Sequence, residues 1–488
     1  MNTKLHVETK CKEEEEDLGE EQPLSPSAEY LNSKALSLCI LAILEFEIPM
    51  DVVRILPLVE DVFIPISSRF SSIMTTNKEG GRRWKIVKVN MHDHVKIPIY
   101  PEGLIINEYD IHFDKYLTKI GIEPLPEDKP LWEIHIFKYP TSKAAGSLIF
   151  KLHHSLGDGY SLMGALLSCL QRADDSSLPL TFPSTRRVPE ANDSSQRMIN
   201  VINRVARNIC SIYNGVCEFG WSIAKVGWVV DDETPIRSGS QGVGFHPTIN
   251  ISSVDLSLDM LIQVKTKLNV VLKLQTINAV LTGIIFFAAR SYMQDAGQSF
   301  RNSRSTVAVL LNTRNVNGYM SIKDMLKTES KMWGNQFAFL HIAFPEIIAN
   351  HNYSNALDFV FESQKFIKAK KNSPAVYLTG LFLEIVRKCR GSEVAAEYVR
   401  GALKNSSIGF TSIIGPVEKM ALLDQPVKGL YFMVTGTHLS ITITAMSYKR
   451  SLRIGIGTEL GFIDSVKFKS CIEKAFEVIY DAAMSNTS

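Results

Sequence analysis

The sequence predicts a mixed α/β protein with two domains. Its 488 residues are enough for two hydrophobic cores. Apolar runs of strand length alternate with longer runs in which apolar residues recur at helical spacing, almost to the end of the chain. Residues 171–198, which are polar and rich in Pro and Ser, and the Gly-rich residues 235–247 interrupt this pattern. We therefore expect one domain over residues 23–190, a linker over 191–245 and a second domain over 246–488.

The expected first domain alternates strand and helix patterns. A mainly apolar stretch at 35–47 predicts a strand, and residues 49–60 have the spacing of a helix that Pro57 would bend or end. The type of the element at 111–120 stays open. Further strands are expected at 82–89, 130–137 and 147–152, and a helix is expected at 162–170.

The expected second domain ends in a β-hairpin and a helix. Residues 439–445 and 451–457 alternate apolar and polar side chains on either side of a turn, and a helix at 467–484 closes the chain. Before the hairpin we expect helices near 256–268 and at 275–294, a strand at 305–311 and a long amphipathic region at 346–404.

The linker contains a candidate amphipathic helix at 198–230. Apolar residues recur there at helical spacing, and Trp221 and Trp228 are among them. Glu218 and Lys225 interrupt any apolar run long enough to span a bilayer. Two interpretations stay open: a helix packed on the protein, or an interfacial helix whose Trp and basic residues lie among lipid headgroups.

Charge and cysteine spacing argue against several classes of protein. The net charge of +2 lacks the basic excess that nucleic-acid binding usually requires. Residues 1–22 hold three Lys against eight Asp and Glu, a local charge of −5, and lack the apolar core of a secretory signal, so we expect an acidic, disordered leader. The seven cysteines form no C-x-x-C pair and no zinc-ligand spacing, which favours a reducing compartment and predicts no metal site.

The string HHSLGDG at 153–159 is the strongest candidate for a functional site. Its two histidines follow the predicted strand at 147–152, where the chain must turn into the next helix. Histidine can accept a proton near neutral pH if it is held in one orientation, and Asp158, four residues after His154, is a candidate for holding it. The alternative is that the histidine pair is structural or part of a metal site.

This string resembles the HHxxxDG signature of the coenzyme-A-dependent acyltransferase superfamily. Other motifs resemble the plant-type branch of the wax ester synthase/diacylglycerol acyltransferase family, in family order along nearly the whole chain: PLSP at 23–26, RFSS at 69–72, PLWE at 130–133, LNTR at 311–314, WGNQF at 333–337 and IIGP at 413–416. The resemblance implies the two-domain coenzyme-A-dependent acyltransferase-like fold. In that fold two mixed-sheet α/β domains meet at the active site.

The resemblance also implies residue roles. His154 would be the general base that takes a proton from the acceptor hydroxyl, which then attacks the thioester of acyl-CoA without an acyl-enzyme intermediate. His153 would support it. Asp158 would fix the turn by pairing with a basic residue, for which Arg314 is a candidate, or it would cap the following helix.

Four further residues are candidates for substrate contact. The family has an Asn-Asp pair at the start of a second-domain helix, and the equivalent pair here is Asn278-Ala279. Asn278 would position the oxyanion or the substrate, or it would be an ordinary residue of a helix start, and the missing Asp would weaken or redirect activity. Trp132 in PLWE would line the acyl tunnel or belong to the core. Gly157 and Gly159 would allow a tight turn and close approach to the substrate.

The implied function is the acyl-CoA-dependent formation of wax esters from fatty alcohols, of triacylglycerol from diacylglycerol, or of both. Acyl-CoA is then a co-substrate, and neither a bound cofactor nor a nucleic acid is expected. Two alternatives stay open: acylation of a small soluble alcohol, and a catalytically weakened member that binds lipid or acyl-CoA. The family's location implies peripheral or monotopic association with the endoplasmic reticulum membrane, with the plasma membrane as a second location.

Overall fold

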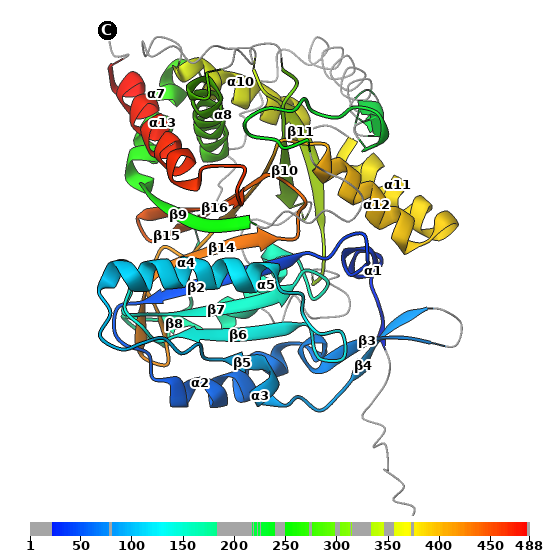
Figure 1. The fold of residues 1–488 in the computed structure, drawn as a ribbon, viewed down its shortest axis with the longest axis vertical. Coiled ribbons are helices and arrows are strands. Elements are labelled where there is room, and N and C mark those ends of the chain that lie inside the picture. Colours follow the sequence, from blue (N-terminus) through cyan, green and yellow to red (C-terminus); the bar gives the residue numbers. More distant parts are fainter. Residues whose placement is uncertain are drawn as a thin grey trace, which may run out of the picture.

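The structure is a computed structural model with two stacked mixed sheets (Figure 1). It describes residues 22–77, 81–182, 249–272, 276–297, 303–312, 314, 333–345, 356–371 and 375–485, together with 217–239 apart from 218, 222 and 225. The expected acidic leader, apart from residue 22, and most of the expected linker lie outside the described residues.

The first sheet, in the lower half of Figure 1, has the strand order β5-β6-β7-β2-β14-β13-β8. Its strands are β5 (Val95–Lys96), β6 (Trp132–Phe137), β7 (Gly146–His153), β2 (Cys39–Phe46), β14 (Gln425–Thr435), β13 (Met420–Leu422) and β8 (Gln171–Arg172). Every residue of the central strand β2 is buried, because alternate side chains enter two different hydrophobic clusters, one on each face of the sheet. Burial on both faces explains why this strand is apolar at every position except Glu45.

Helices cover both faces of the first sheet. On one face lies α4 (Ile106–Ile122), which confirms a regular element at 111–120 and identifies it as a helix. The other face packs against α2 (Val52–Leu58) and α5 (Gly159–Ser168). Pro57 does not end the helical segment, which continues as a π-helical turn over Val59–Phe63. Around this domain lie α1 (Pro26–Leu31), α3 (Met91–His94), and a small sheet formed by β1 (Gln22–Pro23), β3 (Ser72–Thr76) and β4 (Arg82–Ile86).

The second sheet has the strand order β11-β10-β12-β15-β16-β9. Its strands are β11 (Phe337–Ala343), β10 (Thr306–Asn312), β12 (Ile408–Ile414), β15 (Ile441–Tyr448), β16 (Ser451–Glu459) and β9 (Ile249–Ser257). The predicted hairpin is confirmed: β15 and β16 pair antiparallel from Tyr448↔Ser451 to Ile441↔Thr458.

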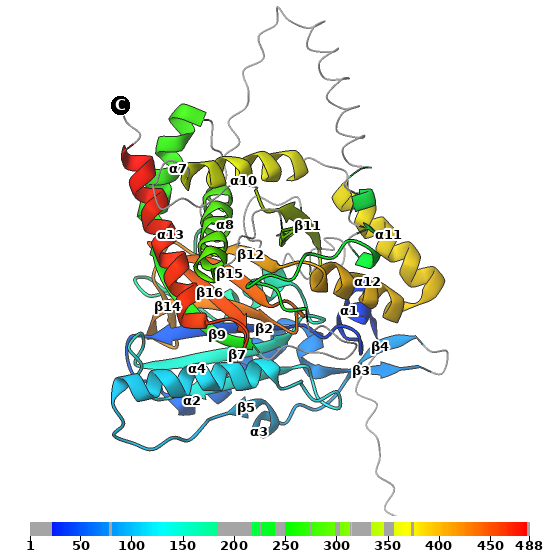
Figure 2. The ribbon, with the colours of Figure 1, turned by 45° about the horizontal axis from the view of Figure 1, so that its top comes forward.

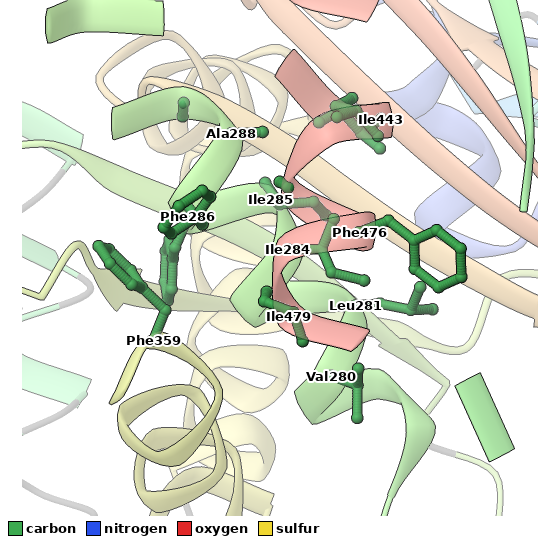
Figure 3. Packing of buried hydrophobic residues seen from close by; sticks show 14 of the residues in the cluster. Val280, Leu281, Ile284, Ile285, Phe286, Ala288, Phe359, Ile443, Phe476 and Ile479 are labelled. Carbon is green, nitrogen blue, oxygen red and sulfur yellow. The ribbon is translucent and has the colours of Figure 1, made fainter. Parts of the chain in front are cut away.

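Four helices cover the second sheet on the side away from the first (Figure 2). They are α7 (Leu258–Leu272), α8 (Ile277–Asp295), α10 (Ala356–Lys371) and α13 (Ser465–Ser485). The central helix, α8, is buried along most of its length, and Figure 3 shows its Ile284 and Ile285 between Ile479 of α13 and Ile443 of β15. A helix enclosed on all sides needs apolar residues all round, and the α8 sequence has them. A further helix pair, α11 (Ala375–Arg390) and α12 (Ser392–Lys404), lies at the edge of the molecule beside α1 (Figures 1 and 2).

The division into two contiguous domains is wrong for one segment. Strands β13 and β14 come from the expected second domain, yet they belong to the first sheet, where β14 pairs antiparallel along β2 from Cys39 to Phe46. The chain then returns to the second sheet as β15. The expected second domain therefore contributes β13 and β14 to the first sheet, and the chain connects the two sheets at both ends of this segment.

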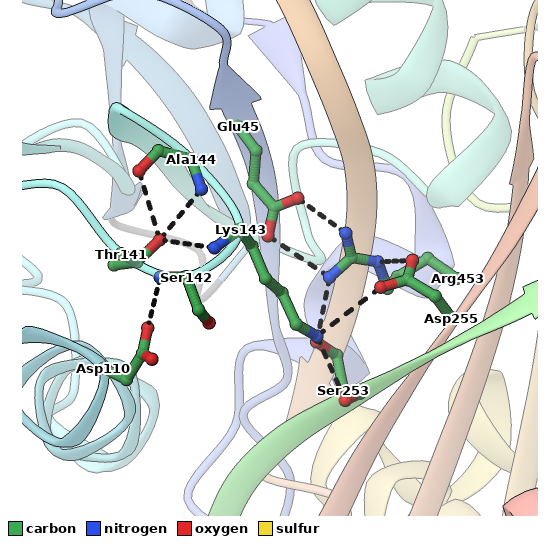
Figure 4. A network of polar contacts seen from close by, with 9 residues as sticks. All are labelled: Glu45, Asp110, Thr141, Ser142, Lys143, Ala144, Ser253, Asp255 and Arg453. Carbon is green, nitrogen blue, oxygen red and sulfur yellow. Dashed lines mark hydrogen bonds and ion pairs between the residues drawn. The ribbon is translucent and has the colours of Figure 1, made fainter. Parts of the chain in front are cut away.

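A polar network joins the two sheets near the start of β14 (Figure 4). Arg453 of β16 donates to Glu45 of β2 at 2.7 Å and also forms an ion pair with Asp255 of β9. Lys143, from the loop between β6 and β7, reaches Asp255 at 3.7 Å and Ser253 at 3.0 Å. Since Glu45 and Arg453 are both buried and pair with each other across the two sheets, the network fixes how the sheets face one another.

Candidate active site

The HHSLGDG string forms the turn between β7 and α5. Strand β7 ends at His153, the His154 amide donates to the Leu38 carbonyl at 2.8 Å, and α5 begins at Gly159. A β-carbon on Gly159 would lie only 2.8 Å from the Ile413 side chain of β12. Glycine is therefore needed here for close approach between the two domains, whereas its contact with a substrate stays a prediction.

Residues 333–336 of the second domain lie against this turn. Each of these four residues bonds to it: Trp333 Nε1 donates to Leu156 O at 3.2 Å, Gly334 O accepts from Asp158 N at 3.4 Å, Asn335 Nδ2 donates to His154 O at 2.8 Å, and Gln336 N donates to Asp158 Oδ2 at 2.9 Å. The candidate site is therefore assembled from both domains.

Asp158 holds these two segments together. Its carboxylate forms an ion pair with Arg314 at 2.5 Å, which confirms the expected partner, and it accepts from the Ser161 amide at 3.1 Å as the N-cap of α5. Arg314 donates in addition to Gly334 O at 2.6 Å and to Ser161 Oγ at 3.1 Å. Both expected roles of Asp158, ion-pair partner and helix cap, hold at once.

His154 is buried and contacts the second domain through its ring. Its Nδ1 lies 2.9 Å from Asn335 Oδ1, and the Phe337 ring meets its ring edge-on with 5.3 Å between centroids. Burial lowers the pKa of His154 below its ordinary value, although the charge of Asp158 and the bond to Asn335 act against this. His154 is therefore neutral at neutral pH and able to accept a proton.

His153 has different surroundings, as expected for the neighbouring position of an extended strand. The Ser155 amide donates to its Nδ1 at 3.2 Å, so the proton must be on Nε2, which lies 3.0 Å from Ser37 Oγ. Burial lowers the pKa of His153 to about 3. These contacts make His153 a neutral structural histidine that shapes the turn, consistent with a supporting role.

Two cavities adjoin His154 and Asn335. The smaller, of about 80 Å³, lies between the sheets and is lined by His154, by Ile40, Phe432 and Val434 of the first sheet, and by residues of β10 and β12. The larger, of about 350 Å³, is mostly apolar and is lined by α1, residues 333–339, α11 and Val399 of α12. Phe337 lines both cavities, so the two spaces meet the same side chain.

The other expected substrate residues lie at different distances from the site. Trp132 is completely buried in the first domain, donates to Phe70 O at 2.8 Å and stacks on His94. It lines neither of these two cavities and is packed as a core residue, as the alternative interpretation expects. Asn278 is exposed in the first turn of α8 and accepts a bond at 3.1 Å from Ser412, which lines the smaller cavity.

Gly157 and Ala279, the residue after Asn278, lie away from both cavities. Gly157 is buried in the turn without lining either cavity, and a β-carbon there would come within 3.0 Å of the Ser161 side chain, so it serves the turn. Ala279 is buried in the second-domain core. Within the described residues, no group of three His, Cys, Asp or Glu could hold a metal ion.

Sequence reasoning missed Asn335 and Phe337 as residues of the site. The WGNQF motif was noticed in the sequence, but no role was assigned to it. An Asn with an aromatic residue two positions later gives no chemical signal by itself, because it becomes meaningful only when the fold brings it to the histidine.

The chain is similar in sequence to known acyltransferases. Residues 333–480 match the family described as the WS/DGAT C-terminal domain. Wax ester synthase/diacylglycerol acyltransferase 4 of Arabidopsis thaliana is 27% identical over 472 residues, covering 92% of this chain and 88% of the relative. Wax ester synthase/diacylglycerol acyltransferase 7 of the same plant is 28% identical, covering 90% and 92%.

Solved structures have the same two-domain fold. The wax ester synthase/diacylglycerol acyltransferase from Marinobacter aquaeolei aligns with a TM-score of 0.60 at 14% identity, over 95% of this chain and all of that one. Trichothecene 15-O-acetyltransferase from Fusarium sporotrichioides aligns with a TM-score of 0.56 at 12% identity, over 95% and 94%. These alignments confirm the predicted fold class.

Proposed function

The chain belongs to the wax ester synthase/diacylglycerol acyltransferase family, and on that premise we propose that it transfers acyl groups from acyl-CoA to the hydroxyl of a fatty alcohol, of diacylglycerol or of both. The observation that carries this proposal is the neutral, buried His154 at a cavity between the two domains, held through Nδ1 by the second domain. Its other ring nitrogen, Nε2, is then the atom available to a substrate.

In the proposed reaction His154 handles the only proton that moves. Nε2 takes the proton of the acceptor hydroxyl while the oxygen attacks the thioester carbonyl, and the tetrahedral intermediate collapses with cleavage of the C–S bond. The departing thiolate of coenzyme A takes the proton back from Nε2. No acyl-enzyme, cofactor or metal enters this scheme. In support, burial raises the pKa of Cys39 to about 11 and of Cys169 to about 12, so neither thiol of the first domain is a ready nucleophile.

The larger cavity supports a long-chain substrate. It is mostly apolar, and its volume of about 350 Å³ falls at the lower end of the ~300–1,000 Å³ typical of small-molecule sites. We propose that an alkyl chain extends from the smaller cavity past Phe337 into this space. Asn278 would not contact the substrate itself; it would orient the Ser412 hydroxyl, which lines the smaller cavity.

The decisive experiment is an assay of the purified protein with long-chain acyl-CoA and either 1-hexadecanol or diacylglycerol, with esters detected by thin-layer chromatography. We expect an ester from at least one of the two acceptors. Product from short, water-soluble alcohols alone would replace the proposal by that narrower activity. Acyl-CoA binding without any product would instead indicate a catalytically weakened member, consistent with Ala279 at the position of the family Asp.

We further propose peripheral docking on a membrane, at the cytosolic face of the endoplasmic reticulum. Within the described residues, no helix has the length and apolarity to span a bilayer. The described part of 217–228 packs on α11, with 5.8 Å between the Phe219 and Phe382 rings, yet Trp221 and Trp228 are 43% and 83% exposed. Leu381 of α11 is also exposed, and the last turn of α11 is basic, a combination suited to anionic headgroups.

Flotation with liposomes that contain anionic lipid tests the docking proposal. The double change Trp221→Ser and Trp228→Ser should reduce flotation while acyl-CoA binding is kept. The matched control is Ile99→Ser, which removes an equally exposed apolar side chain from the first domain and should leave flotation unchanged. A wild-type protein that stays in the soluble fraction, or a double variant that floats as before, would overturn the proposal.

A further inference from the structure

Asn335 makes two hydrogen bonds to the same residue of the other domain. Its Oδ1 lies 2.9 Å from His154 Nδ1, and its Nδ2 donates to the His154 carbonyl at 2.8 Å. A backbone carbonyl can only accept, so the amide nitrogen must face it and the amide oxygen must face the ring. An amide oxygen also only accepts, which requires the proton of neutral His154 to be on Nδ1.

From this geometry we infer that Asn335 is a positioning residue that fixes the tautomer of His154, leaving the lone pair of Nε2 for the substrate. The inference rests on the proposed role of His154 as the base. It also means that the second domain determines which nitrogen of a first-domain histidine can act as base.

The backbone around Asn335 is held strongly enough for this role. Gly334 before it has φ +117°, which disfavours any side chain, and both its N and its O bond to Ser161 Oγ at 3.1 Å. The amide of Gln336 after it donates to Asp158 at 2.9 Å. The ion pair of Asp158 with Arg314 therefore acts on the base indirectly, through the position of Asn335.

The neighbouring histidine shows that the tautomer is set locally. His153 accepts the Ser155 amide proton at Nδ1, so its own proton is on Nε2, the opposite arrangement from His154 one residue later. The hydrogen bond from the ring to the carbonyl of His154 itself also raises the pKa of His154, but less than the bond to Asn335 does. Among the described residues, the side-chain atom placed at hydrogen-bond distance from Nδ1 is the amide oxygen of Asn335, which favours a proton there.

Substitutions of Asn335 should change the pH profile in opposite directions. Asn335→Asp places a negative charge at Nδ1, which stabilises the protonated ring and should move the acidic limb of kcat/KM upward by about 1–3 pH units. Asn335→Ala removes a bond that favours the protonated ring and should move the limb to lower pH. It should also lower kcat by about 10–100-fold, the range seen when partners that orient a metal-bound histidine are removed.

The experiment measures kcat/KM against pH for the wild type, both Asn335 variants and Asn250→Asp. Asn250 lies on β9, at the other edge of the second sheet from β11, and its side chain donates to Ser465 Oγ at the start of α13, so this control adds the same charge and should leave the limb in place. A purely structural role would reduce the amount of folded enzyme without moving the limb. Unmoved limbs in both Asn335 variants would overturn the inference.

The tautomer itself can be read without any activity. In protein labelled with ¹⁵N-histidine, the resonances of His154 are assigned by their loss in His154→Gln, and their shifts report which nitrogen carries the proton. We expect Nδ1–H in the wild type. A proton on Nε2 would overturn the inference even in an active enzyme, whereas Nδ1–H in a protein that makes no ester would leave it standing while the proposed function fails.

Discussion

The change Asp158→Asn should destabilise the protein about as much as it impairs turnover. The carboxylate is 7% exposed, and its partner Arg314 is completely buried at 2.5 Å. An asparagine keeps one oxygen for the Ser161 amide but turns an NH₂ group toward Arg314 and toward the Gln336 amide, all of which are donors. Arg314 would then be a buried charge without its carboxylate.

The size of the effect follows from the cost of an unpaired buried charge. Removing one partner of a buried ion pair typically costs about 3–5 kcal/mol, a large part of the ~5–15 kcal/mol by which proteins are stable. At roughly 2–4 °C per kcal/mol, the thermal midpoint should fall by roughly 6–20 °C, and the size of this chain favours the lower part of that range. Turnover falls with it, because residues 333–336 lose one of their contacts with the turn.

Circular dichroism melting and the ester assay, run on the same preparations, check this prediction. The control is Asp259→Asn, which breaks an Asp–Arg pair with Arg450 that is exposed and therefore contributes little to stability. Adding Arg314→Gln to Asp158→Asn removes the unpaired charge, so the double variant should melt above the single one. A well-folded Asp158→Asn protein with wild-type melting and lost turnover would refute the reasoning, since Asp158 would then act on the reaction itself.

Three further outcomes are expected from the ester assay. His154→Ala should lose about 10²–10⁴-fold in kcat while the protein stays folded, and His153→Ala should lose far less turnover. Equal, small losses in the two variants would show that His154 is not the general base. Because burial lowers the pKa of His154, kcat/KM of the wild type should stay level as the pH falls through 6.5 and decline only below it; a decline that begins above 6.5 would contradict the neutral base. Leu383→Trp fills part of the larger cavity and should reduce turnover of hexadecanol more than of short alcohols, whereas an unchanged chain-length preference would show that no alkyl chain enters there.

Local patterns predicted the elements that depend on neighbours in sequence. The hairpin of β15 and β16 follows from alternation on both sides of one turn, and β2 follows from an apolar run too short for a spanning helix. The turn at 153–159 could be placed because its glycines and its flanking strand and helix are contiguous. Arg314, which was named as a candidate partner of Asp158, does pair with it in the structure.

Contacts between distant segments could not be predicted in the same way. Strand β14 has a pattern suited to any buried sheet, and nothing in it specifies pairing with β2, almost 400 residues earlier along the sequence. Trp132 illustrates the same limit at the level of one side chain: an apolar residue in a strand is compatible with a core or with a tunnel, and only the packing around Phe70 and His94 decides.

A site divided between two domains keeps its geometry here for three reasons. Strands β13 and β14 join the first sheet, Arg453 pairs with Glu45, and residues 333–336 bond to the turn at 153–159. At one end of β2, Cys39 pairs with His153, next to the base, and six residues along the strand Glu45 enters the network with Arg453. At ~3.3 Å per residue, these points are about 20 Å apart. The first sheet is thus attached to the second at both ends of β2, through Arg453 at one end and through Asn335 at the other. Two separated attachments resist rotation as well as separation, and a base whose tautomer depends on the opposite domain requires that resistance.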